Sequence, residues 1–266
     1  MPNSIVKRDS KHFKKFKDAY NDKLYDVEEV DSKLFEGTNM QNCCIFCFKD
    51  HIDGLHIKYL DGKEENLKCI NEKDYSGFTP YEKEIVKYLY NEKPNIVEGT
   101  HGLNGKSIKK DIIGFANKLL SKLPDGKAYL ICNATDGTPS GRWTHRFFSS
   151  KVGQIFDNKE DLKKWIINNA KMCHYMYIDS VIAAKNIKLA MQRPLLRFSL
   201  IYTQTDQNMK PSKHYIYIPN INWEDDKVKT DEGILELCGC SKEKAKEYSK
   251  YCKEKIEKFD NNKGSN

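Results

Sequence analysis

The strongest indication of the fold is the segment IVEGTHGLNGKSIKKDIIGFANKLL, residues 96–120. It begins with a short apolar strand, passes through a glycine-rich turn and continues as an amphipathic helix. The apolar residues of that helix recur at spacings of four, three and four, which places them on one face. They are Ile108, Ile112, Phe115 and Leu119. A strand, a glycine turn and a helix in this order favour an α/β layer with some parallel strand pairing.

The chain after this stretch continues the same alternation. Strands are expected at 128–132, 195–202 and 215–218, and helices at 162–170, 178–191 and after a capping residue at Ser241. We therefore predict an α/β fold with a mixed, partly parallel sheet flanked by helices, in a nucleotide-binding-like domain that spans residues 94–266.

The first 93 residues are expected to form an α+β extension. The apolar run at 43–48 predicts a buried strand. Asp61-Gly62 lies between two strand-like runs and is a hairpin signal, because both residue types tolerate positive φ. Residues 40–72 therefore favour a small antiparallel meander, with its last strand at 67–70.

Two helices are expected around that meander. Residues 10–20 place Phe13, Phe16 and Tyr20 on one face, with lysines around them. A second helix begins after Thr79, since Thr79, Pro80 and Glu82 match a capping box with proline in the first turn.

Phosphate chemistry is suggested by the glycine-rich run Glu98-Gly99-Thr100-His101-Gly102-Leu103-Asn104-Gly105-Lys106-Ser107. In a phosphate loop, glycines let backbone N–H groups converge on phosphate oxygens, lysine reaches the β- and γ-phosphates, and serine holds Mg²⁺. The usual pattern has four residues between the first glycine and Gly-Lys-Ser. Here Gly99 leaves five before Gly105, and Gly102 leaves two. The run is therefore either a phosphate loop or a flexible turn before a capped helix.

Two segments together resemble the thymidylate kinase-like nucleoside monophosphate kinases. One is Glu-Gly-x-x-Gly before Gly-Lys-Ser; the other, Asp136-Gly137-Thr138-Pro139-Ser140-Gly141-Arg142, is similar to the Gly-Gly-Thr-Pro-x-Gly segment of that family. The resemblance implies a phosphotransferase that uses ATP and Mg²⁺ on a nucleotide substrate. It implies cofactor binding by Gly99, Gly102, Gly105, Lys106 and Ser107, Mg²⁺ at Ser107, and catalytic roles for Lys106 and Arg142. The family's Asp-Arg pair and arginine-rich lid have no counterpart here, which implies impaired catalysis.

A second candidate site is a metal-ligand pattern near the N-terminus. Cys44, Cys47, His51 and His56 have the spacing C-x2-C-x3-H-x4-H, and thiolate and imidazole ligands suit tetrahedral zinc. The apolar residues between the ligands favour a buried strand instead, in which cysteine behaves as a small apolar residue. The strand interpretation is the simpler one, so zinc is not expected.

Composition limits the class of protein. Nine cysteines, no secretory signal and no long apolar segment favour a reducing, cytoplasmic location without a membrane partner. The abundance of Lys, Asn and Tyr is typical of an AT-rich genome, for example a viral one, in which case the location is the host cytoplasm. The net charge of +7 is modest and spread along the sequence.

Two alternatives to a phosphotransferase stay open. Asp61-Gly62, Ile70-Asn71 and the helix that follows them give residues 59–88 a resemblance to insect-virus polyhedrin, which implies a non-enzymatic viral structural or occlusion-body protein that self-associates. The basic excess permits a nucleic-acid-binding protein, although no clear motif indicates one.

Overall fold

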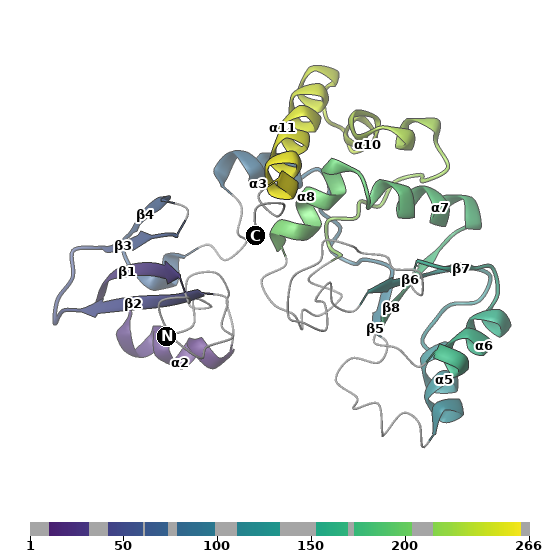
Figure 1. Ribbon diagram of the computed structural model, residues 1–266, viewed down its shortest axis with the longest axis horizontal. Coiled ribbons are helices and arrows are strands. Elements are labelled where there is room, and N and C mark those ends of the chain that lie inside the picture. Colours follow the sequence, from purple (N-terminus) through teal and green to yellow (C-terminus); the bar gives the residue numbers. More distant parts are fainter. Residues whose placement is uncertain are drawn as a thin grey trace. The chain divides into compact units, whose positions relative to one another are not determined.

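The computed structural model describes residues 11–31, 42–60, 62–73, 79–98, 111–133, 153–169, 173–203 and 215–261. The chain divides into two compact units, residues 1–77 (unit 1) and 78–266 (unit 2). Each unit contains a four-stranded sheet with helices packed against it (Figure 1). Among the described residues, no helix is long and apolar enough to cross a membrane.

Unit 1 contains sheet A, with strand order β2-β1-β3-β4. Its elements are α2 (Lys11–Tyr20), β1 (Leu24–Asp31), β2 (Asn42–Phe48), β3 (Leu55–Lys58), β4 (Glu64–Leu67) and the short 3-10 helix η2 (Ile70–Glu72). Strand β1 is antiparallel to β2 and parallel to β3, and β3 is antiparallel to β4.

The predictions for unit 1 are partly confirmed. The helix at 10–20, the strand at 43–48 and the hairpin are present, and Gly62 adopts a φ of 79° in that turn. The strand at 43–48 is not buried as predicted, because β2 lies at the edge of the sheet with Ile45 and Phe48 exposed. The simple meander is wrong, because β1 inserts between β2 and β3. The second hairpin strand also ends at Leu67, since Ile70 belongs to η2.

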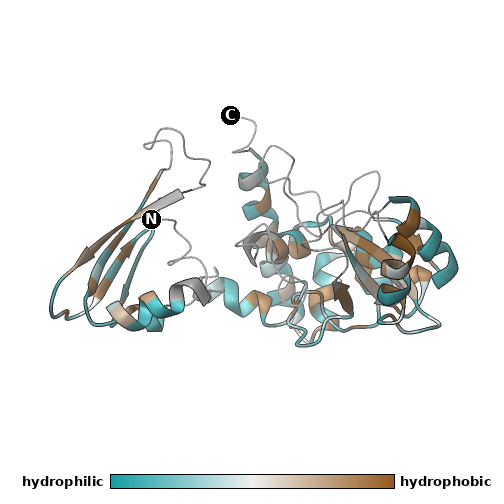
Figure 2. Ribbon diagram, turned by 90° about the horizontal axis from the view of Figure 1, so that it is seen from below, coloured by the Kyte–Doolittle hydropathy of each residue, from teal (hydrophilic) through white to brown (hydrophobic). Residues whose placement is uncertain are grey.

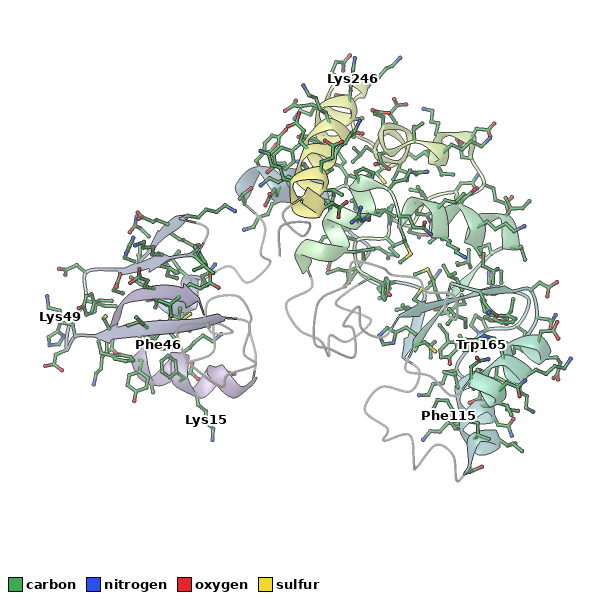
Figure 3. The ribbon with its side chains drawn as sticks, viewed as in Figure 1. Lys15, Phe46, Lys49, Phe115, Trp165 and Lys246 are labelled. Atoms are coloured by element: carbon green, nitrogen blue, oxygen red, sulfur yellow. The ribbon has the colours of Figure 1, made fainter. Side chains whose placement is uncertain are left out.

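One face of sheet A packs against α2 and η2. Val27, Ile57 and Ile70 are fully buried there, and the Phe16 ring of α2 lies 5.6 Å from the Phe46 ring of β2. Figure 3 shows Phe46 on the side of the sheet that faces α2. The opposite face carries polar residues such as Asp26 and His56, because residues alternate between faces along a strand.

Unit 2 contains sheet B, with strand order β5-β8-β6-β7 and only antiparallel pairs among its described strands. Its elements are α3 (Pro80–Val86), β5 (Ile96–Glu98), α5 (Ile112–Leu120), β6 (Ala128–Asn133), β7 (Ile155–Phe156), α6 (Lys159–Asn169), β8 (Cys173–Ile178), α7 (Val181–Ala190), α8 (Pro194–Thr203), the 3-10 helix η3 (Asp226–Lys229), α10 (Asp231–Leu237) and α11 (Lys242–Asn261).

Sheet B is the middle layer of three. Helices α5 and α6 cover the face that carries Tyr129, Ile131 and Tyr175. Helices α3, α7, α8, α10 and α11 pack on the face that carries Leu130 and Met176. Because both faces are buried, β6 and β8 are almost continuously apolar, which Figure 2 shows as brown strands between helices with teal outer sides.

The predicted α/β class, with a mixed, partly parallel sheet and flanking helices, is confirmed. The parallel pair, however, is β1 with β3 in unit 1, whereas parallel pairing was expected after residue 94. The division between units falls at residues 77 and 78 instead of 93 and 94. The reason is that α3 packs with α11: the Tyr251 hydroxyl donates to Glu82 at 2.8 Å, and Lys255 pairs with Glu82 at 3.2 Å.

Two predicted strands of unit 2 are wrong. Residues 194–203 form helix α8. Its side chains from Leu195 to Leu200 are buried except at Arg197, so the sequence lacks the regularly spaced polar residues by which an amphipathic helix is recognised. Residues 215–218 form a turn. The helix expected at 178–191 begins at Val181, because Ile178 ends strand β8, which was not predicted.

Candidate phosphate-binding edge of sheet B

Two strands of sheet B end together at one edge. Strands β5 and β6 lie on either side of β8 and are both antiparallel to it, so they run in the same direction. At their ends, His174 of β8 is paired with Glu98 of β5 on one side and with Cys132 of β6 on the other. Adjacent strands are 4.7–4.9 Å apart, so the ends of β5 and β6 are separated by about 10 Å.

Both segments singled out from the sequence leave the sheet at this edge. The glycine-rich run follows Glu98, and the segment Asp136–Arg142 follows Asn133, the last residue of β6. All of their predicted site residues lie outside the described residues: Gly99, Gly102, Gly105, Lys106, Ser107 and Arg142. What the described strands establish is that the two segments start from neighbouring points.

The described part of this edge is lined by buried polar side chains. His174 is 1% exposed, and its ring meets that of Tyr215 edge-on at 6.2 Å between centroids. Burial raises the pKa of the Cys132 thiol well above its ordinary value, although a hydrogen bond with Tyr215 opposes this. Cys132 is therefore a neutral thiol at pH 7, which does not suit a nucleophile.

Two further segments join the same edge. Residues 170–172 precede Cys173, which pairs with Asn133, and residues 204–214 precede Tyr215 beside His174. The segment after β6 also returns here, because the backbone N–H of Gly153 donates to the carbonyl of Ile131 at 2.7 Å.

The sequence of these four segments is strongly basic. Residues 99–110, 134–152, 170–172 and 204–214 together contain 9 Lys+Arg and 2 Asp, with no Glu. The rest of the chain contains 36 Lys+Arg and 36 Asp+Glu, so the whole excess of +7 belongs to segments that connect at one edge.

Helix α5 begins later than predicted. Its first residue is Ile112, and the Asp111 carboxylate accepts a hydrogen bond from the Gly114 backbone N–H at 2.8 Å. The helix was expected to include Ile108, directly after Gly-Lys-Ser. Because Asp111 caps α5 with its own carboxylate, the N-terminus of this helix is occupied by an internal anion.

The zinc pattern is not assembled. Cys44 lies on the covered face of β2 with Phe46, whereas Cys47 lies on the opposite face, because the two cysteines are three positions apart on a strand. His51 is exposed beyond the end of β2. In the part of the chain that the structure describes, no group of three or more His, Cys, Asp or Glu residues is arranged to hold a metal ion.

His56 belongs to a different cluster, which the sequence did not indicate. Its Nδ1 lies 2.8 Å from Asp26 Oδ1 on β1, and its Nε2 lies 3.5 Å from Glu64 Oε2 on β4. The hydrogen bond to Asp26 raises the pKa of His56 above its ordinary value, and Glu64 adds to this effect. The cluster was missed because it depends on the pairing of β1 with β3, and β1 was not predicted.

Comparisons of the chain with protein-family models, characterised proteins and solved structures give no match.

Proposed function

We propose that unit 2 is a phosphotransferase that binds a nucleotide through its phosphates at the edge formed by Glu98, Asn133 and His174. One observation carries the proposal: four segments with a combined charge of +7 connect at this edge, while the remainder of the chain is electrically balanced. Clustered positive charge is what recognition of a phosphorylated ligand requires. In open, mostly parallel α/β sheets, ligands commonly bind beyond the carboxyl ends of the strands, and the carboxyl ends of β5 and β6 lie at this edge.

The proposed roles follow from the two segments that leave β5 and β6. Lys106 neutralises phosphate charge, Ser107 binds Mg²⁺, and Arg142 holds the phosphate of the acceptor. Their segments start about 10 Å apart, which suits donor and acceptor phosphates placed side by side. Since Asp111 caps α5, the phosphates bind the N–H groups and side chains of the glycine-rich run itself, without the help of the α5 dipole.

The test is calorimetric titration of the full chain with MgATP and with a nucleoside monophosphate. Lys106→Ala is expected to weaken MgATP binding at least tenfold, and Arg142→Ala to weaken binding of the monophosphate by a similar factor. Lys118→Ala, an exposed lysine of α5, is the matched control and should leave both affinities unchanged. Transfer of radiolabelled γ-phosphate to the monophosphate then tests the reaction. Equal binding by the wild type and both site variants refutes the proposal.

A second candidate, nucleic-acid binding, is favoured by a specific feature of the same edge. Nine basic residues exceed what one mononucleotide needs, and the segment after β6 interleaves Arg142 and Arg146 with Trp143, Phe147 and Phe148. Aromatic and basic residues together are typical of surfaces that bind single strands. Oligonucleotide affinity that falls steeply with salt, with undetectable MgATP binding, selects this alternative.

A further inference from the structure

In the described part of the chain, the two sheets have four edge strands, and three of them are poor templates for pairing. On sheet B, β5 has three residues and β7 has two. On sheet A, β4 has four residues, of which Glu64 and Glu65 are charged. Short and charged edge strands are the usual protection against pairing with another chain.

Strand β2 is the exception. Its sequence, Asn-Cys-Cys-Ile-Phe-Cys-Phe over residues 42–48, is seven residues long and contains neither charge nor proline. Ile45 is 49% exposed and Phe48 is 46% exposed. Among the described residues, β2 pairs only with β1, on one side. An edge of this length presents a row of backbone N–H and C=O groups that another strand can satisfy.

We propose that β2 pairs with β2 of a second copy of this chain, antiparallel, so that sheet A continues into the sheet of its partner. A copy of the same strand fits for electrostatic reasons, because an uncharged strand places no like charges opposite one another. In the register centred on Ile45, that residue faces its own equivalent, and Cys44 faces the position of Phe46 in the other copy. Unit 1 provides this surface, so the proposal is independent of nucleotide binding by unit 2.

The aromatic cluster beside β2 supports the same occupant. The Phe48 ring lies 5.0 Å from the Tyr20 ring and 6.2 Å from the Phe16 ring of α2, on the covered face of the sheet. The two-fold axis of an antiparallel pair is perpendicular to the sheet, so both α2 helices lie on the same face of the joined sheet. In this register Phe48 lies opposite Asn42 of the other copy, so the apolar contact on this face is between Phe46 of one copy and Cys44 of the other, near the centre of the new strand pair.

Light scattering coupled to size exclusion tests the proposal with the full chain. The wild type is expected to change from the monomer mass of 31.0 kDa to twice that value as its concentration rises. Ile45→Lys should abolish the dimer, because it places two charges opposite each other at the centre of the pairing. Ile113→Lys, at an isoleucine of α5 that is 57% exposed, is the matched control and should leave the dimer intact. A monomer at all concentrations, or a dimer that survives Ile45→Lys, overturns the proposal.

Cross-linking provides a second measurement that does not depend on destabilising the strand. With Ile45→Cys, mild oxidation by diamide should join two chains through the new thiols, which gives a band at twice the monomer mass on a non-reducing gel. Diamide accepts the two electrons and two protons released as the disulfide forms. The wild type and Ile113→Cys, treated identically, measure the background from the native cysteines. Cross-linking of Ile45→Cys no greater than that background refutes the β2 pairing.

Discussion

Replacing Asp231 by alanine is expected to destabilise unit 2 by about 3–5 kcal/mol, the cost of breaking a buried ion pair by removing one partner. The Asp231 carboxylate is 7% exposed, accepts from Arg193 Nε at 3.0 Å and accepts from the backbone N–H of Leu195 at 3.0 Å. It therefore joins the start of α10 to the first turn of α8. Leu195 is fully buried, and an N–H left without an acceptor there accounts for about 1–3 kcal/mol of the loss.

The variant Asp231→Asn separates the two contributions. Asparagine keeps an oxygen that accepts from the Leu195 N–H but removes the charge that faces Arg193. We expect it to lose about half as much stability as the alanine variant, since only the charge-assisted part of the interaction is removed.

Urea denaturation followed by tryptophan fluorescence measures this effect in unit 2 alone. Trp165 and Trp223 are buried in unit 2, and residues 1–77 contain no tryptophan. With slopes of 1–3 kcal/mol per molar urea, a loss of about 4 kcal/mol moves the midpoint by about 2 M. A midpoint for Asp231→Ala within about 0.3 M of the wild type refutes the reasoning. So does equal destabilisation by both variants, which would mean that the Leu195 hydrogen bond contributes nothing.

Two further predictions concern single side chains. His56 has its pKa raised above 6.5 by Asp26 and Glu64, so its contribution to the stability of unit 1 is fully present below pH 6.5 and is lost as the pH rises through the folded-state pKa. Hydrogen exchange of β1 and β3, corrected for intrinsic rates, should therefore be faster at pH 8 than at pH 6, and His56→Gln should remove the difference. Thr79→Ala deletes the side chain that accepts from the Glu82 N–H at 3.2 Å and should cost about 1 kcal/mol, whereas Thr79→Ser should be nearly neutral in the same urea assay.

Local signals predicted the elements that depend on local chemistry. The capping box at Thr79 and Glu82 forms as expected, with the Thr79 N–H donating to Glu82 at 2.8 Å, and Ser241 caps α11. The Asp-Gly signal correctly gave the hairpin between β3 and β4. Each of these features is stabilised by groups within a few residues of one another, so the sequence contains the whole interaction.

The elements that were mispredicted depend on distant parts of the chain. Residues 195–202 lack polar residues at helical spacing because most side chains of α8 are buried. The first turn of α8 is held by Asp231, which accepts from the Leu195 N–H and lies 36 residues further along the chain. Strand β1 contains four acidic residues, two of them adjacent, and becomes a central strand only because β2 and β3 pair with it. Propensity and pattern alone do not determine such elements, since packing decides between helix and strand.

The same distinction applies to the candidate edge. The glycine-rich run and the segment that ends at Arg142 were visible in the sequence, but the common edge from which they start depends on β8, which was not predicted and which inserts between β5 and β6. Alternate strands of an antiparallel sheet run in the same direction, so β5 and β6 end at a common edge as neighbouring strands of a parallel sheet do. The proposal of phosphate binding therefore does not require a parallel sheet.

The proposal requires that Lys106 and Arg142 act on one ligand, which a double-mutant cycle measures. Non-additive losses of affinity for a bisubstrate analogue, in which both nucleotides are joined through their phosphates, are the expected result, and simple additivity would place the two residues at separate sites.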